Sequence, residues 1–320
     1  MSAQEDTFAI PVSAHIRGEF MMHYRPQSIV AMLAITMIIG CSTDSSLKTN
    51  TPGTGDHQST GTGSTKNGEP MKFSPNPPEG WLWSHDINPK RIDDAELPEM
   101  HQVRLSVYGN NDDRRFAAII YRVAGVESIF LPELTAAELD TKIAASGARP
   151  VSVTAGEVNG EIRFTLVLHK GPGPKSDVRV DLDETALKQS ATDSNRIADF
   201  AVYTVNGVRK YAAIVEERPG PSMVFTHLTA KELDKQLRKH DVTPVRIRGY
   251  YAGDTRYFSA VAERLNAGEW NWYDGINADK VASKLDSNHG YPFDLDAYRQ
   301  PGTEYDVHYT VVMYRDRDDY

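Results

Sequence analysis

The sequence predicts a β-rich α+β domain made of five tandem βββα units of about 48 residues each. Two observations predict it: a strand-like segment recurs along the chain, and a helix start recurs in step with it. The strand-like segments begin at Phe116, Phe164, Tyr211, Phe258 and Tyr309, with spacings of 48, 47, 47 and 51 residues. Because the spacing is nearly constant, each repeat is predicted to be one structural unit.

Each unit contains a helix start of the same kind. The first residue is always Asn, Asp or Thr, whose side chain accepts a hydrogen bond from an otherwise unpaired backbone N–H. An apolar residue stands directly before it and another stands four residues after it, which is a hydrophobic staple. The five predicted starts are Asn88, Thr135, Asp183, Thr229 and Asn277.

Within a unit the pattern predicts a strand, a tight turn, a strand, a loop, a third strand and a helix. First strands alternate apolar and polar residues, as at Val245 and Ile247. A glycine such as Gly253 follows and predicts a hairpin turn. The helices are short, and each packs one apolar stripe, as at Leu233 and Leu237.

The repeat is predicted to be permuted by half a unit. The chain enters it at Trp81 with a third strand and a helix, and its last strand, near Tyr314, completes a hairpin. These two halves are complementary. We therefore expect the Trp81–Trp83 strand to pair with or pack beside the C-terminal hairpin and close a propeller-like ring, with an open solenoid as the alternative.

One unit resembles a known repeat. The stretch VNGVRKYAAIVEERPGPSMVFTHLTAKELDKQL, from Val205 to Leu237, is similar to the bacterial tandem repeat in the N-terminal domain of fungal polyglycine hydrolases. The similarity covers residues of about 79–320. In those hydrolases the peptidase is a separate C-terminal domain that resembles β-lactamases, and this sequence ends with the repeats. The resemblance therefore implies the repeat fold and no catalytic residues.

The region before the repeats predicts a lipoprotein signal. An apolar run from Ser28 to Gly40 follows Arg25 and is too short for a membrane-spanning helix. It ends Ile-Ile-Gly-Cys, which resembles the lipobox of bacterial lipoproteins, where the cysteine receives a diacylglycerol thioether. Cys41 is the only cysteine. We therefore predict lipidation at Cys41 and a cell-envelope location, with Ser42 favouring the outer membrane of a Gram-negative cell.

The domain boundaries follow from composition. Residues 1–20 are acidic and do not fit a signal peptide, so translation is predicted to begin at Met21 or Met22 and residues 21–40 to form the signal. Residues 41–78 are predicted to be a flexible tether. From Ser42 to Pro78, 23 of 37 residues are Ser, Thr, Gly or Pro. Such a segment buries too little apolar surface to offset the entropy lost when a chain becomes ordered. Residues 79–320 then form a single repeat domain.

Composition and motifs argue against several functions. The formal charge of −9 makes nucleic acid an unexpected partner, because phosphate binding needs basic surface. A single cysteine excludes a multi-cysteine zinc site. The sequence has no Gly-x-Ser-x-Gly and no Gly-rich phosphate loop, and no two histidines of the repeats share a helix face at metal-ligand spacing. No enzyme, catalytic residue, metal or cofactor is therefore predicted.

Binding residues are expected where the units differ. Trp81 and Trp270 stand where other units have serine, and tyrosines gather in the last two units. Large aromatic side chains with few rotors favour recognition surfaces. An aromatic shelf for a glycan or peptide is one interpretation and an enlarged local core is the other. The candidate ligand-binding residues are Trp81, Trp270, Tyr250, Tyr251 and Tyr273.

Charged residues on two neighbouring first strands also match. Arg246 and Arg248 are predicted to point outward from one strand, and Asp294 and Asp296 occupy the same positions in the next unit. If these strands lie side by side, they form a charge ladder between units. A solvated charged face is the alternative.

Together these features predict a monomeric, lipid-anchored protein of the cell envelope. Its repeat domain is expected to be a binding or scaffolding module for a protein, peptide or glycan of the envelope. A peptidase-type hydrolase, or an accessory subunit of one, is the alternative.

Overall fold

The computed structural model describes residues 57–62, 77–95, 99–220, 222–265, 267–303 and 306–315. The predicted start site, the signal peptide and Cys41 lie outside the described residues. No helix among the described residues has both the length and the apolar character needed to cross a membrane.

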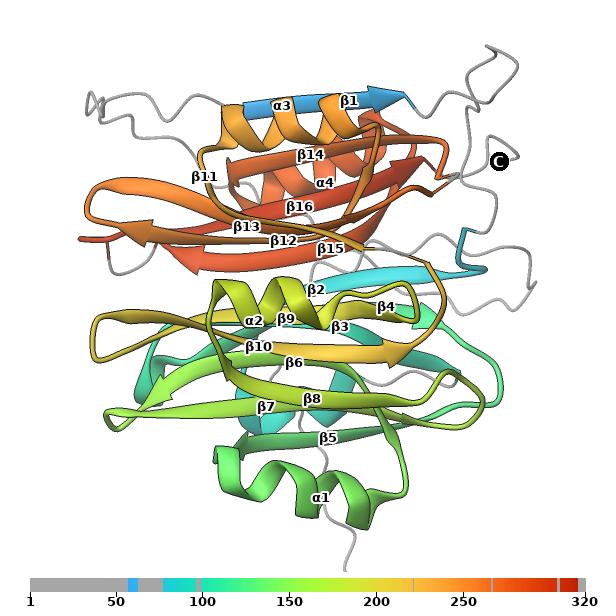
Figure 1. The fold of residues 1–320 in the computed structure, drawn as a ribbon, viewed down its shortest axis with the longest axis vertical. Coiled ribbons are helices and arrows are strands. Elements are labelled where there is room, and N and C mark those ends of the chain that lie inside the picture. The colour runs from blue at the N-terminus through green and yellow to red at the C-terminus, as the bar shows by residue number, and fades with distance from the viewer. Residues whose placement is uncertain are drawn as a thin grey trace, which may run out of the picture.

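The described chain is β-rich, and each unit forms its own three-stranded antiparallel sheet (Figure 1). In the first four sheets the strand before the helix lies at one edge, the strand after the helix lies at the other edge, and the last strand lies between them; the fifth sheet keeps this order and has one further strand beside the strand before the helix. In chain order within each sheet, the strands are β2 (Trp81–Ile87), β3 (Met100–Tyr108) and β4 (Arg115–Arg122); β5 (Glu127–Leu134), β6 (Arg149–Val158) and β7 (Glu161–Lys170); β8 (Ser176–Leu182), β9 (Asn195–Val205) and β10 (Val208–Glu217); β11 (Ser222–Leu228), β12 (Thr243–Ala252) and β13 (Thr255–Glu263); and β14 (Glu269–Ile276), β15 (Gly290–Arg299) and β16 (Val307–Arg315).

The structure corrects the predicted unit boundary. Trp81 pairs with Tyr121 and Trp83 pairs with Ile119, both within the first unit. The helix returns the chain to the sheet it has just left, whereas the loop after each hairpin crosses to the next sheet. The five sheets are therefore each contiguous in sequence, and both the half-unit permutation and the pairing of Trp81–Trp83 with the C-terminal hairpin are wrong.

The predicted helix starts are confirmed. Thr229 and Glu232 form a capping box at the start of α3 (Ala230–His240), and Asp183 accepts a hydrogen bond of 2.7 Å from the Ala186 N–H at the start of α2 (Glu184–Ser190). Asn277 caps α4 (Ala278–Ser287) in the same way. In the other two units, α1 (Leu139–Ser146) is preceded by the 3₁₀ turn η3 (Ala136–Glu138), and η1 (Pro89–Ala95) is a 3₁₀ helix throughout.

The predicted hairpin turns are also confirmed. The β9–β10 turn is Asn206-Gly207, with φ angles of 50° and 76°. Both angles are positive, as a type I′ turn requires, and asparagine and glycine are the residues that adopt them most readily. A further short 3₁₀ turn, η2 (Asn111–Asp113), connects β3 to β4.

The strands that follow the helices, β3, β6, β9, β12 and β15, are called the inner strands here because they contact one another in cyclic order. β3 contacts β6, β6 contacts β9, β9 contacts β12, β12 contacts β15, and β15 contacts β3. Figure 1 shows β2 of the first sheet lying next to β15 of the last. The Trp83 ring also packs edge-on against Tyr309 of β16, with 5.9 Å between ring centroids. The expected packing of Trp81–Trp83 beside the C-terminal hairpin is therefore confirmed.

A strand that the sequence did not predict lies within the expected tether. β1 (His57–Thr62) pairs antiparallel with β14, with Gly61 opposite Trp270, and makes the fifth sheet four-stranded. The edge strand β14 would otherwise present unpaired N–H and C=O groups. The extended backbone of β1 satisfies them without an apolar side chain, which is why hydropathy gave no sign of the strand.

Candidate binding site between the inner strands

The inner strands carry a repeated pair of positions that face the space between the sheets, and every residue at these positions except Ala201 is polar. Ser152 of β6 accepts a hydrogen bond of 3.0 Å from the Leu105 N–H of β3, and Asp294 of β15 accepts one of 2.8 Å from the Ile247 N–H of β12. The same contact therefore recurs between successive units. The five pairs are Arg104 and Ser106, Ser152 and Thr154, Asp199 and Ala201, Arg246 and Arg248, and Asp294 and Asp296.

The contact between the last and first units belongs to this series. The Ala297 N–H donates to Ser106 Oγ at 2.9 Å. The equivalent bonds run from the Val107 N–H to Thr154 Oγ1 at 3.2 Å and from the Gly249 N–H to Asp296 Oδ2 at 2.9 Å. The first and fifth sheets are thus joined by the same type of bond that joins neighbouring sheets elsewhere.

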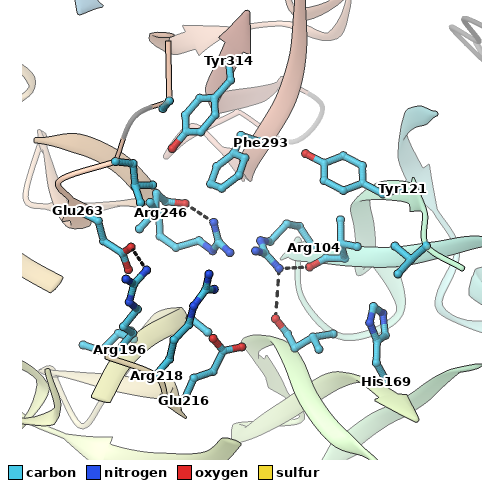
Figure 2. A pocket seen from close by; sticks show the side chains of 18 of the residues that line it. Arg104, Tyr121, His169, Arg196, Glu216, Arg218, Arg246, Glu263, Phe293 and Tyr314 are labelled. Carbon is cyan, nitrogen blue, oxygen red and sulfur yellow. Dashed lines mark hydrogen bonds and ion pairs between the residues drawn. The ribbon is translucent and has the colours of Figure 1, made fainter. Parts of the chain in front are cut away.

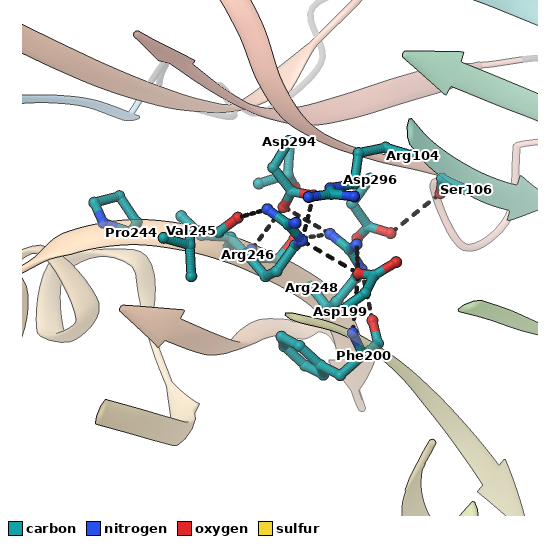
Figure 3. A network of polar contacts seen from close by, with 12 residues as sticks. Arg104, Ser106, Asp199, Phe200, Pro244, Val245, Arg246, Arg248, Asp294 and Asp296 are labelled. Carbon is teal, nitrogen blue, oxygen red and sulfur yellow. Dashed lines mark hydrogen bonds and ion pairs between the residues drawn. The ribbon is translucent and has the colours of Figure 1, made fainter. Parts of the chain in front are cut away.

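Charged side chains at these positions form a buried network, called here the central network and shown in Figure 3. Arg248 donates to Asp199 Oδ1 and to Asp294 Oδ2, both at 2.7 Å. In other units the residue at the position of Arg248 accepts a hydrogen bond from a backbone N–H of a neighbouring unit. An arginine side chain can only donate, so the Arg248 Nε donates to the Phe200 carbonyl at 2.9 Å instead. The members are Asp199, Arg246, Arg248, Asp294 and Asp296.

The predicted pairing of arginines with aspartates across units is confirmed, but its setting differs from the prediction. Arg246, Arg248 and Asp294 are only 3%, 5% and 1% exposed, so neither an exposed ladder nor a solvated face describes them. Burial alone would lower the pKa of Arg248, but the Asp294 and Asp199 carboxylates outweigh it and raise that pKa above its usual value. Burial raises the pKa of the Asp199 carboxyl, and Arg248 opposes the increase.

A pocket of about 550 Å³ opens on one side of the central network (Figure 2). It is called the arginine pocket here, after Arg104, Arg149, Arg196, Arg218 and Arg246, which line it. All five units contribute to its wall. Its volume is within the range of ligand pockets of small molecules and peptide ends.

The five arginines differ in how they are paired. Arg196 donates to Glu263 at 2.5 Å, and Arg246 Nε lies 3.4 Å from Asp199. Arg104 donates to the Val151 carbonyl at 3.3 Å. Among the described residues, no carboxylate lies within ion-pair distance of Arg104, Arg149 or Arg218. Figure 2 shows the guanidinium groups of Arg104 and Arg246 side by side in the pocket, with that of Arg218 directed toward them.

Aromatic rings form another part of the wall. The Tyr121 hydroxyl donates to the Pro292 carbonyl at 2.5 Å, and the Tyr314 hydroxyl donates to the Pro244 carbonyl at 3.1 Å. Phe293 stacks on Tyr314 with 4.1 Å between centroids. Burial raises the pKa of both tyrosines well above the usual value. Because both hydroxyls are donated to the backbone, these side chains offer the pocket chiefly ring carbons.

His169 lies at the edge of the same pocket in its neutral form. Its Nε2 is 2.7 Å from the Gln102 carbonyl, and the side chain is buried. Burial lowers the pKa of His169 to about 4, and the hydrogen bond to Gln102 offsets only part of this. His169 therefore adds no positive charge at neutral pH.

The structure does not gather the sequence-predicted binding residues into one surface. Trp81, Trp270 and Tyr273 are 7%, 5% and 1% exposed and belong to the apolar core, so they cannot form an open shelf. Tyr251 is partly exposed and lies 6.2 Å from Tyr298, measured between ring centroids. The enlarged local core, which was the alternative, describes the three buried rings.

Tyr250 occupies a repeated position with a structural role. Tyr108 and Tyr203 stand at the same place on their inner strands, and each accepts a hydrogen bond from a backbone N–H two residues before a helix cap, Asp86 at 3.0 Å and Asp181 at 2.7 Å. In the fourth unit the partner is His227, whose Nδ1 lies 3.0 Å from the Tyr250 hydroxyl. Tyr250 thus holds the strand bend before α3.

Sequence reasoning missed the arginine pocket itself. Four of its arginines come from four different units. Arg104 and Arg246 are the first members of their repeated pairs, and Arg149 and Arg196 stand just before the pairs of their own units. The signal was available as an arginine near the beginning of each of four inner strands. Recognising it required the knowledge that these strand ends meet.

A second pocket of about 470 Å³ lies toward the other ends of the inner strands. Arg299 and Asp113, which form an ion pair, line it together with Arg248, Asp296 and Tyr298. In the described part of the chain, no group of three or more His, Cys, Asp or Glu residues is placed to hold a metal ion.

No family model matches the sequence, and a search of curated proteins found no match. The resemblance to the repeat domain of fungal polyglycine hydrolases therefore stays a prediction from the sequence.

Proposed function

We propose that this chain is a lipid-anchored binding or scaffolding module of the bacterial cell envelope. Its ligand is a protein, peptide or glycan of the envelope, and the arginine pocket is where that ligand enters. The observation that carries this proposal is a pocket built by all five units in which three arginines have no ion-pair partner among the described residues. Unpaired guanidinium groups in a concave site favour a ligand over a purely structural role.

We further propose that the five sheets form a closed, propeller-like ring. The cyclic contacts of the inner strands support it, as does the hydrogen bond from the Ala297 N–H to Ser106. In a ring the inner-strand ends converge on one axis. This geometry accounts for a pocket that receives one or more side chains from every unit.

The anchor would set where the module works. Cys41 follows an apolar run at the position that lipoprotein processing requires, and residues 41–78 separate it from the domain. The pairing of β1 with β14 would take up part of that segment and bring the domain closer to the membrane surface.

The test is capture of partners from envelope extracts by the detergent-solubilised full-length protein. Arg218→Glu reverses a charge at the exposed mouth of the arginine pocket, and we expect it to abolish capture of the bound component. Arg163→Glu is the matched control, because Arg163 lies on the β6–β7 hairpin and pairs with exposed Glu161. Capture of the same components by both variants would contradict a role for the pocket.

A further inference from the structure

We infer that the arginine pocket binds a single carboxylate that carries an apolar group, as in an N-acylated apolar amino acid or the C-terminus of a peptide ending in an apolar residue. This inference rests on the proposed function of the pocket and specifies the chemistry of its ligand. Three features of the wall support it: the charge balance, the shape of the donors and the character of the aromatic side.

The charge balance leaves room for one negative charge. Six arginines lie in the pocket wall and the central network beneath it, and five carboxylates face them. With His169 neutral, one positive charge remains without a counterion in this group. A monoanion compensates it, whereas a phosphate dianion would leave a net negative charge. The arginines are Arg104, Arg149, Arg196, Arg218, Arg246 and Arg248, and the carboxylates are Asp199, Glu216, Glu263, Asp294 and Asp296.

The donors suit a planar group with two oxygens. A guanidinium presents a flat fork of N–H groups that matches a carboxylate. Arg104 and Arg246 face one another in Figure 2, and each uses one terminal nitrogen on a neighbouring backbone carbonyl. Their Nη2 groups have no hydrogen-bond partner among the described residues. Two like charges held this close repel one another, and an anion between them would remove that repulsion.

The aromatic side favours an apolar substituent. Tyr121 and Tyr314 have donated their hydroxyl hydrogens to backbone carbonyls, and Phe293 has no polar atom. Val103, Val151 and Val245 add further apolar side chains to the pocket lining. A sugar ring would leave several hydroxyls without partners here, at a cost for each buried polar group. An aromatic or aliphatic side chain would instead bury its carbon surface against these rings.

The experiment measures binding of three matched probes to the full-length protein by isothermal titration calorimetry. N-acetyl-phenylalanine has the carboxylate, its amide lacks the charge, and phenyl phosphate replaces the carboxylate with a dianion. We expect N-acetyl-phenylalanine to bind at least tenfold more tightly than either of the others. The tripeptide Gly-Gly-Phe and its C-terminal amide then test whether the ligand is a peptide end or a free acid. If the pocket binds a peptide C-terminus, Gly-Gly-Phe retains the affinity of N-acetyl-phenylalanine and its amide does not. If the pocket binds only a free acid, Gly-Gly-Phe loses that affinity.

Two variants locate the binding. Arg104→Gln and Arg218→Gln should each weaken binding of N-acetyl-phenylalanine about tenfold or more, whereas Arg163→Gln should leave it unchanged. Arg218 is exposed and no side-chain hydrogen bond of it occurs among the described residues, so its variant is expected to fold even if the Arg104 variant does not.

Several results would overturn the inference: equal affinity for the acid and its amide, tighter binding of phenyl phosphate, no binding of the acid, or unchanged affinity in Arg218→Gln. If the acid fails to bind while Arg218→Glu still abolishes capture from extracts, the carboxylate inference is wrong and the proposed function stands. If Arg218→Glu also captures normally, both fall.

Discussion

Arg248 shows at the scale of one residue how this protein uses charge in its interior. Its guanidinium is shared between Asp199 of the third unit and Asp294 of the fifth, although Arg248 itself belongs to the fourth. Removing ions from water is costly, and only close, well-directed hydrogen bonds compensate for it. The central network therefore favours one arrangement of the three units over others in which these charges would be unpaired.

Replacing Asp294 with alanine should destabilise the protein by about 3–5 kcal/mol, because it leaves Arg248 with one buried partner and removes the acceptor of the Ile247 N–H. Chemical denaturation of the full chain measures the change. Asp177→Ala is the control: Asp177 pairs with Arg179 at the surface, and its loss should cost less than about 1 kcal/mol. An equal effect of both substitutions would show that the network adds nothing beyond a surface pair.

His169 predicts how stability depends on pH. Because burial lowers its pKa to about 4 in the folded protein, the unfolded chain binds a proton at higher pH than the folded chain does. Its contribution to stability is therefore fully present above the usual histidine pKa of 6.5 and is lost as the pH falls from 6.5 to about 4.

His169→Gln should remove part of this loss. Melting temperatures of the wild type and the variant between pH 7.5 and 4 measure it, and the difference between the two should shrink or reverse toward acid pH. His289→Gln, at an exposed position, should keep the wild-type slope. A variant that parallels the wild type throughout would contradict the assignment to His169.

At the scale of one element, the repeated helices show why local sequence predicted so much of the secondary structure. A cap such as Thr229 and an apolar stripe such as Leu233 and Leu237 depend on residues within one or two turns. Strand pairing does not: Trp81 pairs with Tyr121 across an intervening helix and strand, and the same hydrophobic pattern fits pairing with either neighbouring hairpin. The elements were therefore predictable, and the unit boundary was not.

The packing of these helices gives a direct test of their register. Leu233 is fully buried beneath α3, so Leu233→Ala should lower the free energy of unfolding by about 2–4 kcal/mol through lost apolar contact and a residual cavity. Lys235→Ala, on the exposed side of the same helix, should change it by less than about 0.5 kcal/mol. Similar values for the two variants would mean that the buried face of α3 is assigned wrongly.

At the scale of the whole molecule, the candidate site depends on contacts that no local pattern contains. Arg104 and Arg246 lie more than two units apart in sequence and come together only because the inner strands meet. Sequence reasoning instead selected large aromatic residues such as Trp270. Large apolar side chains are more often buried in the core than exposed at a binding site, and Trp270 is buried. The charge pairing between these strands was recognised because Arg246 and Arg248 occupy the same positions in the fourth unit as Asp294 and Asp296 in the fifth.

The expected lipid anchor is also a property of the whole molecule. Cys41→Ala should release the protein from membranes, because the apolar run before it is too short to span a bilayer. Fractionation in high salt, followed by immunoblotting of membrane and soluble fractions, measures this. Ser45→Ala, a few residues further along, should remain in the membrane fraction. Retention of both variants in membranes would contradict lipid anchoring at Cys41.

Closure of the five sheets is the last prediction. If the first and fifth units stabilise one another, deleting residues 305–320, which removes β16, should expose the amides of β3 to hydrogen exchange as well as those of β15. In an open array, β15 and the neighbouring fourth unit would lose protection and β3 would keep it. Because such a deletion is severe, Ser106→Ala offers a milder version: it removes only the hydrogen bonds of Ser106 to the Ala297 N–H and Asp296. Thr154→Ala is its match, since it removes the same kind of bond between the first and second units.

A closed ring predicts that Ser106→Ala raises hydrogen exchange in both β3 and β15, to an extent comparable with the effect of Thr154→Ala on β3 and β6. If Ser106→Ala changes neither strand while Thr154→Ala changes both of its own, the first and fifth sheets touch without supporting each other, and the ring is wrong.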